Sequence, residues 1–188
     1  MANGAFERRR NRHQVEFLVS AAKPNARELR GYTRGVALLL AFLFGVVSGF
    51  RSLTPAAVLS WAVQGRPDLQ ASPLAFMAGT TAAYVLTGLA LVELVTDKLP
   101  FTPSRLTTVP LTARILLGGL CGATVAVAGG STLFVGAIAG AIGGVAGAFL
   151  GYQVRRNLTA SKKISDLAVA LAEDAITIGG AYLLGRGL

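Results

Sequence analysis

Charged side chains are scarce in this chain, and so are the residue types that build metal sites and disulfides. Only 14% of the 188 residues are charged, whereas a typical soluble domain has about 25%. The single cysteine, Cys121, excludes an intrachain disulfide, and with one histidine, His13, we predict no metal site and no cofactor. Hydrophobic residues make up 53% of the chain, and the mean hydropathy is +0.57. This composition is typical of an integral membrane protein.

Acidic residues are half as frequent as basic ones, nine against eighteen, which gives a formal charge of +9. In a soluble protein such a balance would indicate nucleic-acid binding. Here the basic residues lie at the ends of apolar segments and no folded basic domain is visible, so membrane topology explains them better. We therefore expect the lipid bilayer as a partner, and no nucleic acid.

Polar sequence is concentrated at the N-terminus, where residues 1–35 hold eight basic and three acidic residues. No short apolar region with a small-residue cleavage site follows the first arginines, so a signal peptide is not expected. We predict a flexible cytoplasmic arm over 1–35 that sets orientation and touches anionic lipid. A docking site for a partner is the alternative. Residues 36–188 are predicted to form a single transmembrane domain.

Five apolar segments follow the arm, each long enough or nearly long enough to span about 30 Å of hydrocarbon. They are residues 36–50, extended by 53–63, then 73–96, 111–128, 132–152 and 166–184. The connections are short, which favours one compact bundle. The predicted fold class is all-α, a polytopic transmembrane bundle of about five helices.

The distribution of basic residues predicts the orientation of this bundle. With the N-terminus inside, the inner segments hold fifteen basic residues and the outer ones hold only Arg66 and Arg186. The positive-inside rule then favours five crossings in a bacterial inner membrane, with the N-terminus cytoplasmic and the C-terminus outside. If residues 53–63 crossed back, the orientation of everything after them would flip, and the charge bias argues against that.

The stretch G-F-R-S-L-T-P interrupts the first apolar segment at Arg51. Fifteen helical residues from Val36 rise only about 22 Å, which places Arg51 in the outer half of the membrane. Pro55 cannot donate to the carbonyl of Arg51 and crowds it, so we predict a broken first helix. Arg51 either snorkels to the outer headgroups, with Trp61 as an interfacial anchor, or joins the exposed amides of the break in a site for an anion or carboxylate.

Four acidic residues in or beside the apolar segments are candidates for a path through the membrane. Glu93 and Asp97 share one helical face, and Asp97 falls at the predicted cytoplasmic boundary. Glu173 and Asp174 lie about 10–12 Å inside the last segment and point about 100° apart. Charged groups within a span usually mark ion or proton paths, although protonation or pairing with a basic residue for stability is the alternative. The similar runs at 89–93 and 169–173 are a weak sign of the inverted repeats found in transporters.

Glycines recur at intervals of four in the third and fourth segments, a spacing that lets helix backbones approach closely. We predict a glycine-zipper fourth helix between two neighbours, with packing inside one chain or in a homodimer as the two possibilities. The predicted helix-packing residues are Gly118, Gly122, Gly136, Gly140, Gly143, Gly144, Gly147 and Gly151.

Together, G-F-R-S-L-T-P, E-L-V-T-D-K-L-P, the glycine-rich segment and A-E-D-A-I-T-I-G-G resemble a family of small bacterial integral membrane proteins, domain of unknown function 4126. The resemblance covers residues 36–184, and its most specific element is the turn Asp97, Lys98 and Pro100 together with Gly49 and Arg51. It implies a membrane location and a shared fold, without an established activity. The loop after this turn carries no acidic residue here, so a cation-binding role does not transfer to it.

Three functions are compatible with these residues. The one we favour is a small transporter or channel for an ion or small solute, with Arg51, Glu93, Asp97, Glu173 and Asp174 along its path. The alternative is a structural or assembly protein in which the buried charges only stabilise packing. A lipid enzyme is the least favoured, because the carboxylates are scattered and the chain has one histidine, so we predict that the protein is not an enzyme.

Overall fold

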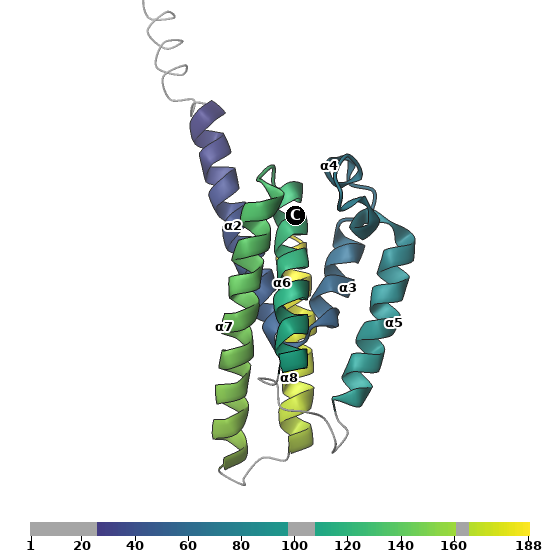
Figure 1. Ribbon diagram of the computed structural model, residues 1–188, viewed down its shortest axis with the longest axis vertical. Coiled ribbons are helices and arrows are strands. Elements are labelled where there is room, and N and C mark those ends of the chain that lie inside the picture. The colour runs from purple at the N-terminus through teal and green to yellow at the C-terminus, as the bar shows by residue number, and fades with distance from the viewer. Residues whose placement is uncertain (1–25, 98–107, 161–165) are drawn as a thin grey trace, which may run out of the picture. The chain divides into compact units, whose positions relative to one another are not determined.

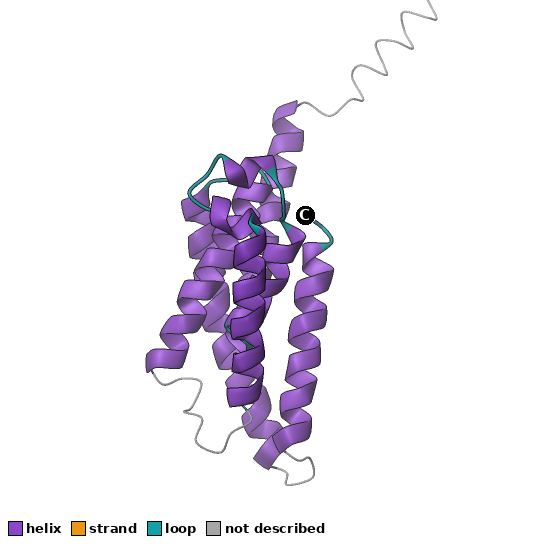
Figure 2. Ribbon diagram, turned by 90° about the vertical axis from the view of Figure 1, so that its right-hand side faces the viewer, coloured by secondary structure: helices purple, strands orange, loops and turns teal. Residues whose placement is uncertain are grey.

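The computed structural model describes residues 26–97, 108–160 and 166–188, and residues 34–188 form one compact unit. Most of the predicted N-terminal arm lies outside the described residues. Within the described ranges there is no strand (Figure 2). The helices are α2 (Ala26–Phe50), α3 (Leu53–Ala62), α4 (Pro67–Gln70), the 3-10 helix η1 (Ala75–Ala78), α5 (Thr80–Thr96), α6 (Thr108–Ala128), α7 (Leu133–Ala160) and α8 (Asp166–Gly185) (Figure 1).

Four of these helices are long and apolar enough to cross a membrane, namely those of the predicted first, third, fourth and fifth segments. The predicted second segment is only partly helical, because α5 begins at Thr80 rather than at residue 73, after the separate turn η1. The 17 residues of α5 rise about 26 Å. The all-α bundle and the broken first helix are thus confirmed.

Residues 53–63 were expected to extend the first segment. They do not, because the chain reverses between α2 and α3. Along α8, Gly180 lies beside Val47 of α2, and Gly185 lies beside both Phe44 of α2 and Ala62 of α3. The residues of α2 that lie beside α8 therefore fall in number as α8 advances, so the two helices are antiparallel. Helix α3 runs parallel to α8, because Arg51, just before α3, contacts Asp174, and Ala62 at its end lies beside Gly185. The helix break is a reversal, which hydropathy alone cannot distinguish from a kink.

This reversal brings the start of the spanning part of α2 and the C-terminus to one end of the bundle. A Cβ atom on Gly129 would meet Ala37, and the Arg66 guanidinium donates hydrogen bonds to the carbonyl oxygens of Ala128 and Leu188. We call this the Arg66 end, and the other, where α2 turns into α3, the Arg51 end. Ala37 and Leu188 share the Arg66 end, which does not agree with the predicted placement of the two termini on opposite sides.

Helix α7 packs between α6 and α2 through its glycines. Cβ atoms built on Gly136, Gly140 and Gly144 would overlap the backbone or Cβ atoms of α6, and those on Gly143 and Gly147 would overlap the backbone of α2. From the other side, Gly118 and Gly122 of α6 face α7 in the same way. Gly151 is buried. These close approaches are all contacts within one chain.

Candidate functional site

The arginine of the opening motif lies at the reversal and is fully buried. Arg51 is 0% exposed, the largest side chain in the described residues that is completely covered. Its amide still donates to Val47 at the end of α2, and α3 begins two residues later. Pro55 falls in the first turn of α3. Backbone N–H groups in a first turn have no partner within the helix, so proline, which lacks one, is tolerated there. The proline thus explains why the helix cannot continue through Arg51.

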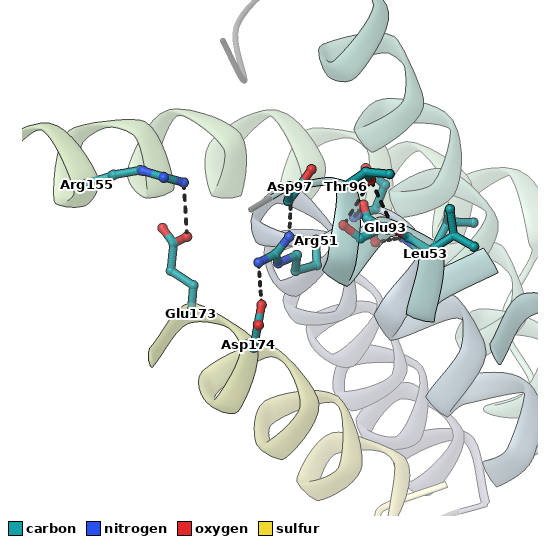
Figure 3. A network of polar contacts seen from close by, with 10 residues as sticks. Arg51, Leu53, Glu93, Thr96, Asp97, Arg155, Glu173 and Asp174 are labelled. Carbon is teal, nitrogen blue, oxygen red and sulfur yellow. Dashed lines mark hydrogen bonds and ion pairs between the residues drawn. The ribbon is translucent and has the colours of Figure 1, made fainter. Parts of the chain in front are cut away.

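Two carboxylates from other helices converge on the Arg51 guanidinium (Figure 3). One terminal nitrogen pairs with Asp97 at the end of α5 and the other with Asp174 of α8. The predicted interpretation in which Arg51 snorkels to the headgroups is wrong, because the side chain has no exposed surface. The predicted depths of Arg51, in the outer half of the membrane, and of Asp97, at the inner boundary, exclude each other, because the two side chains are in contact.

Glu93 binds the backbone of the reversal rather than the guanidinium. Its two carboxylate oxygens accept hydrogen bonds from the amides of Ser52, at 2.7 Å, and Leu53, at 2.9 Å. The first amides of a helix have no partner within the helix and carry part of its positive dipole end, so a carboxylate is favoured there. The exposed amides of the break were one predicted site for an anion or carboxylate. In the structure the carboxylate of Glu93, from the same chain, binds these amides.

The adjacent acids of α8 contact different partners, as their angular separation requires. Asp174 contacts Arg51, whereas Glu173 lies 3.9 Å from a terminal nitrogen of Arg155 in α7 (Figure 3). Both acids are buried, while Asp97 keeps 21% of its side chain exposed. We call Arg51, Glu93, Asp97, Asp174, Glu173 and Arg155 the Arg51 network. It joins α2, α3, α5, α7 and α8 at one end of the bundle.

Unpartnered polar atoms lie within one helical turn of this network. The hydroxyl groups of Thr54 in α3 and Thr177 in α8 are buried without a hydrogen-bond partner, and so is the Nε atom of Arg51. Leaving a buried polar group without a partner costs about 1–3 kcal/mol. Such groups in a native structure call for an explanation such as a bound water or ion. The bundle interior next to the network is thus polar enough to hold one.

The sequence did not reveal the surroundings of two basic residues, one of them in the Arg51 network. Arg155 and Arg114 were counted as cations of cytoplasmic loops, whereas Arg155 contacts Glu173 and Arg114 is buried in α6. A basic residue near the end of a span has the same sequence pattern whether it faces lipid headgroups or a carboxylate. Only the packing of α7 against α8 separates the two cases.

Comparisons with known proteins identify a family. No curated protein and no solved structure matches the chain. One family model matches residues 38–184, a range that includes the whole Arg51 network. The chain belongs to the family described as Domain of unknown function (DUF4126).

Proposed function

We propose that this multi-pass integral membrane protein is a small transporter or channel, not an enzyme, and that an ion or small solute passes the Arg51 network. One observation carries the proposal: a completely buried arginine at a helix reversal contacts carboxylates of two other helices. A charged group within a span costs about 2.5–3.5 kcal/mol on insertion scales, and such groups usually mark substrate or ion paths. Helices broken within the membrane form the binding sites of many transporters.

The geometry supports a gate at the Arg51 end. Asp97 is the more exposed of the two acids that contact Arg51, with 21% of its side chain exposed against 11% for Asp174. Arg51 can release Asp97 and keep Asp174, which would free the end of α5 while the guanidinium stays paired. A cation bound to Asp97 would compete with Arg51 for the carboxylate and weaken their contact. The unpartnered hydroxyls of Thr54 and Thr177 would then contact the entering ion or solute.

An assembly role is the second candidate, and a different observation favours it. The carboxylate of Glu93 is used to cap α3, and the glycines of α7 are used in tight packing within the chain. A protein built for rigid packing would show both features. In that case the partner would bind elsewhere, at the N-terminal arm or at a homodimer interface.

Flux across proteoliposomes that hold the full chain separates the two candidates. Under imposed proton, sodium or potassium gradients we expect flux in the wild type and its loss in Arg51→Gln and Glu173→Gln. Asp68→Asn at the Arg66 end, where Asp68 is 57% exposed, is the matched control and should keep the wild-type rate. Because Cys121 is the only cysteine and is buried, its reaction with a thiol dye reports whether each variant is folded. Absence of flux from the folded wild type would overturn ion transport and favour assembly.

The reversal at Arg51 also changes the proposed topology. We propose that both termini face the cytoplasm of a bacterial inner membrane. The sequence places ten basic residues in the arm and at the Arg66 end, against seven in the segments that border the α5–α6 and α7–α8 connections. The positive-inside rule therefore supports a cytoplasmic Arg66 end, although by a smaller margin than the five-crossing count.

Single-cysteine labelling tests this topology. In a Cys121→Ala background, cysteines at the exposed positions Arg34 and Gly187 should react with a membrane-impermeant maleimide from the same side. A cysteine at Arg156, which is exposed near the end of α7, should react from the other side. Labelling of positions 34 and 187 from opposite sides would contradict the same-side arrangement.

A further inference from the structure

A groove of about 500 Å³ lies between the C-terminal ends of α3 and α8, at the Arg66 end. It is separate from the Arg51 network and no step of the proposed transport uses it. Its lining residues are Val58, Trp61, Ala62, Tyr182, Gly185 and Arg186. Trp61 and Tyr182 are 44% and 57% exposed, so the groove opens on the outer surface of the bundle.

Small residues form the floor of the groove and aromatic residues form its walls. A Cβ atom on Gly185 would lie 3.2 Å from the Cβ atom of Ala62, so α3 and α8 approach closely there. The Trp61 indole donates a 3.0 Å hydrogen bond to Thr87 and packs edge-on against Tyr84, which holds it in place. The apolar volume is therefore a preformed feature and not a gap that neighbouring side chains would fill.

A cation stands at one end of this apolar groove. The Arg186 guanidinium lies 5.8 Å from the centre of the Tyr182 ring, and in the described part of the chain no carboxylate contacts it. The nearby Arg66, in contrast, is engaged by two carbonyl oxygens and Asp68. An exposed arginine beside an apolar groove has the charge and geometry to bind a phosphate group.

The outer surface of a membrane-spanning bundle is covered by lipid, and tryptophan and tyrosine concentrate where acyl chains meet headgroups. We propose that this groove binds one anionic phospholipid. An acyl chain lies over Ala62 and Gly185 between Trp61 and Tyr182, and the phosphate group binds Arg186. The volume is within the range of about 300–1,000 Å³ that is usual for small-molecule sites. Basic pockets between spanning helices are a known way to select anionic headgroups.

The only tryptophan of the chain lines the groove, so its fluorescence reports occupancy directly. The full chain is reconstituted with increasing fractions of brominated phosphatidylglycerol or brominated phosphatidylcholine, and quenching of Trp61 is measured. We expect half-maximal quenching at a several-fold lower fraction of the anionic lipid. Arg186→Gln should remove this difference, and Arg156→Gln, an exposed arginine of α7, should retain it.

A second variant tests the apolar half of the site. Gly185→Leu fills the floor between α3 and α8, so quenching by the anionic lipid should fall to the level of phosphatidylcholine while the thiol of Cys121 stays protected. Equal quenching by the two lipids in the wild type would overturn the proposal. A preference that survives in Arg186→Gln, or that is unchanged in Gly185→Leu, would overturn it as well.

Discussion

Replacing Arg51 with leucine is expected to destabilise the protein by about 3–5 kcal/mol, which is the usual loss when one partner of a buried ion pair is removed. The reason is that Asp97 and Asp174 both contact the guanidinium. Without it, two carboxylates remain at one buried site with no positive charge between them. The free energy of unfolding in detergent can be followed by the reaction of Cys121, which is 0% exposed in the folded protein.

Two further variants separate this explanation from a general effect of mutation. Asp68→Asn removes an exposed ion pair with Arg66, which is worth about 0–1 kcal/mol. Combining Arg51→Leu with Asp97→Asn and Asp174→Asn removes the repulsion and should recover much of the lost stability. If Arg51→Leu and Asp68→Asn had equal effects, the network would have no special role in stability.

Gly140→Ala is expected to have the second-largest effect, a loss of about 1–3 kcal/mol from overpacking. A methyl group on Gly140 would overlap the carbonyl oxygen of Gly118 and come within 2.9 Å of the Gly122 Cα atom. These are backbone atoms, so α6 and α7 would have to move apart. The same Cys121 assay measures the change.

Gly88 is the matched control for this substitution, because it lies in α5 with no atom within 4 Å of its Cβ position. Gly88→Ala should leave stability unchanged or raise it by up to about 1 kcal/mol, the difference in helix propensity between the two residues. Equal destabilisation by Gly88→Ala and Gly140→Ala would show that the close approach of α6 and α7 does not limit packing.

The sequence predicted the helical spans and the break because both depend on local chemistry. Apolar length identifies α6 and α7, and the missing N–H of Pro55 requires an interruption near Arg51. The direction of α3 could not be predicted in this way, since the ten residues of this helix would be mainly apolar whether the chain kinks or reverses. The charge count could not correct this, because it treated Arg114 and Arg155 as free cations when one is buried and the other contacts Glu173.

The four acids were found in the sequence because charge is rare in an apolar segment, but their partners were not. Pairing between Arg51 and Asp97 joins residues 46 positions apart and depends on the reversal that was missed. The bidentate cap of Glu93 on Ser52 and Leu53 depends on it too. Once α3 folds back, each of these contacts follows from the antiparallel arrangement of α3 and α5.

The glycine spacing of α7 also restricts how this helix can slide. Gly136, Gly140 and Gly144 face α6 at intervals of four residues, and a side chain larger than hydrogen at their positions would meet backbone. A shift of α7 along α6 by one or two residues would put alanine or isoleucine where a glycine is needed. Even a step of four residues, about 6 Å, would return glycine to only two of the three positions, because Ala148 or Thr132 would take the third. The contact between α6 and α7 therefore has a single register, and any movement of α7 along α6 would first have to separate the two helices.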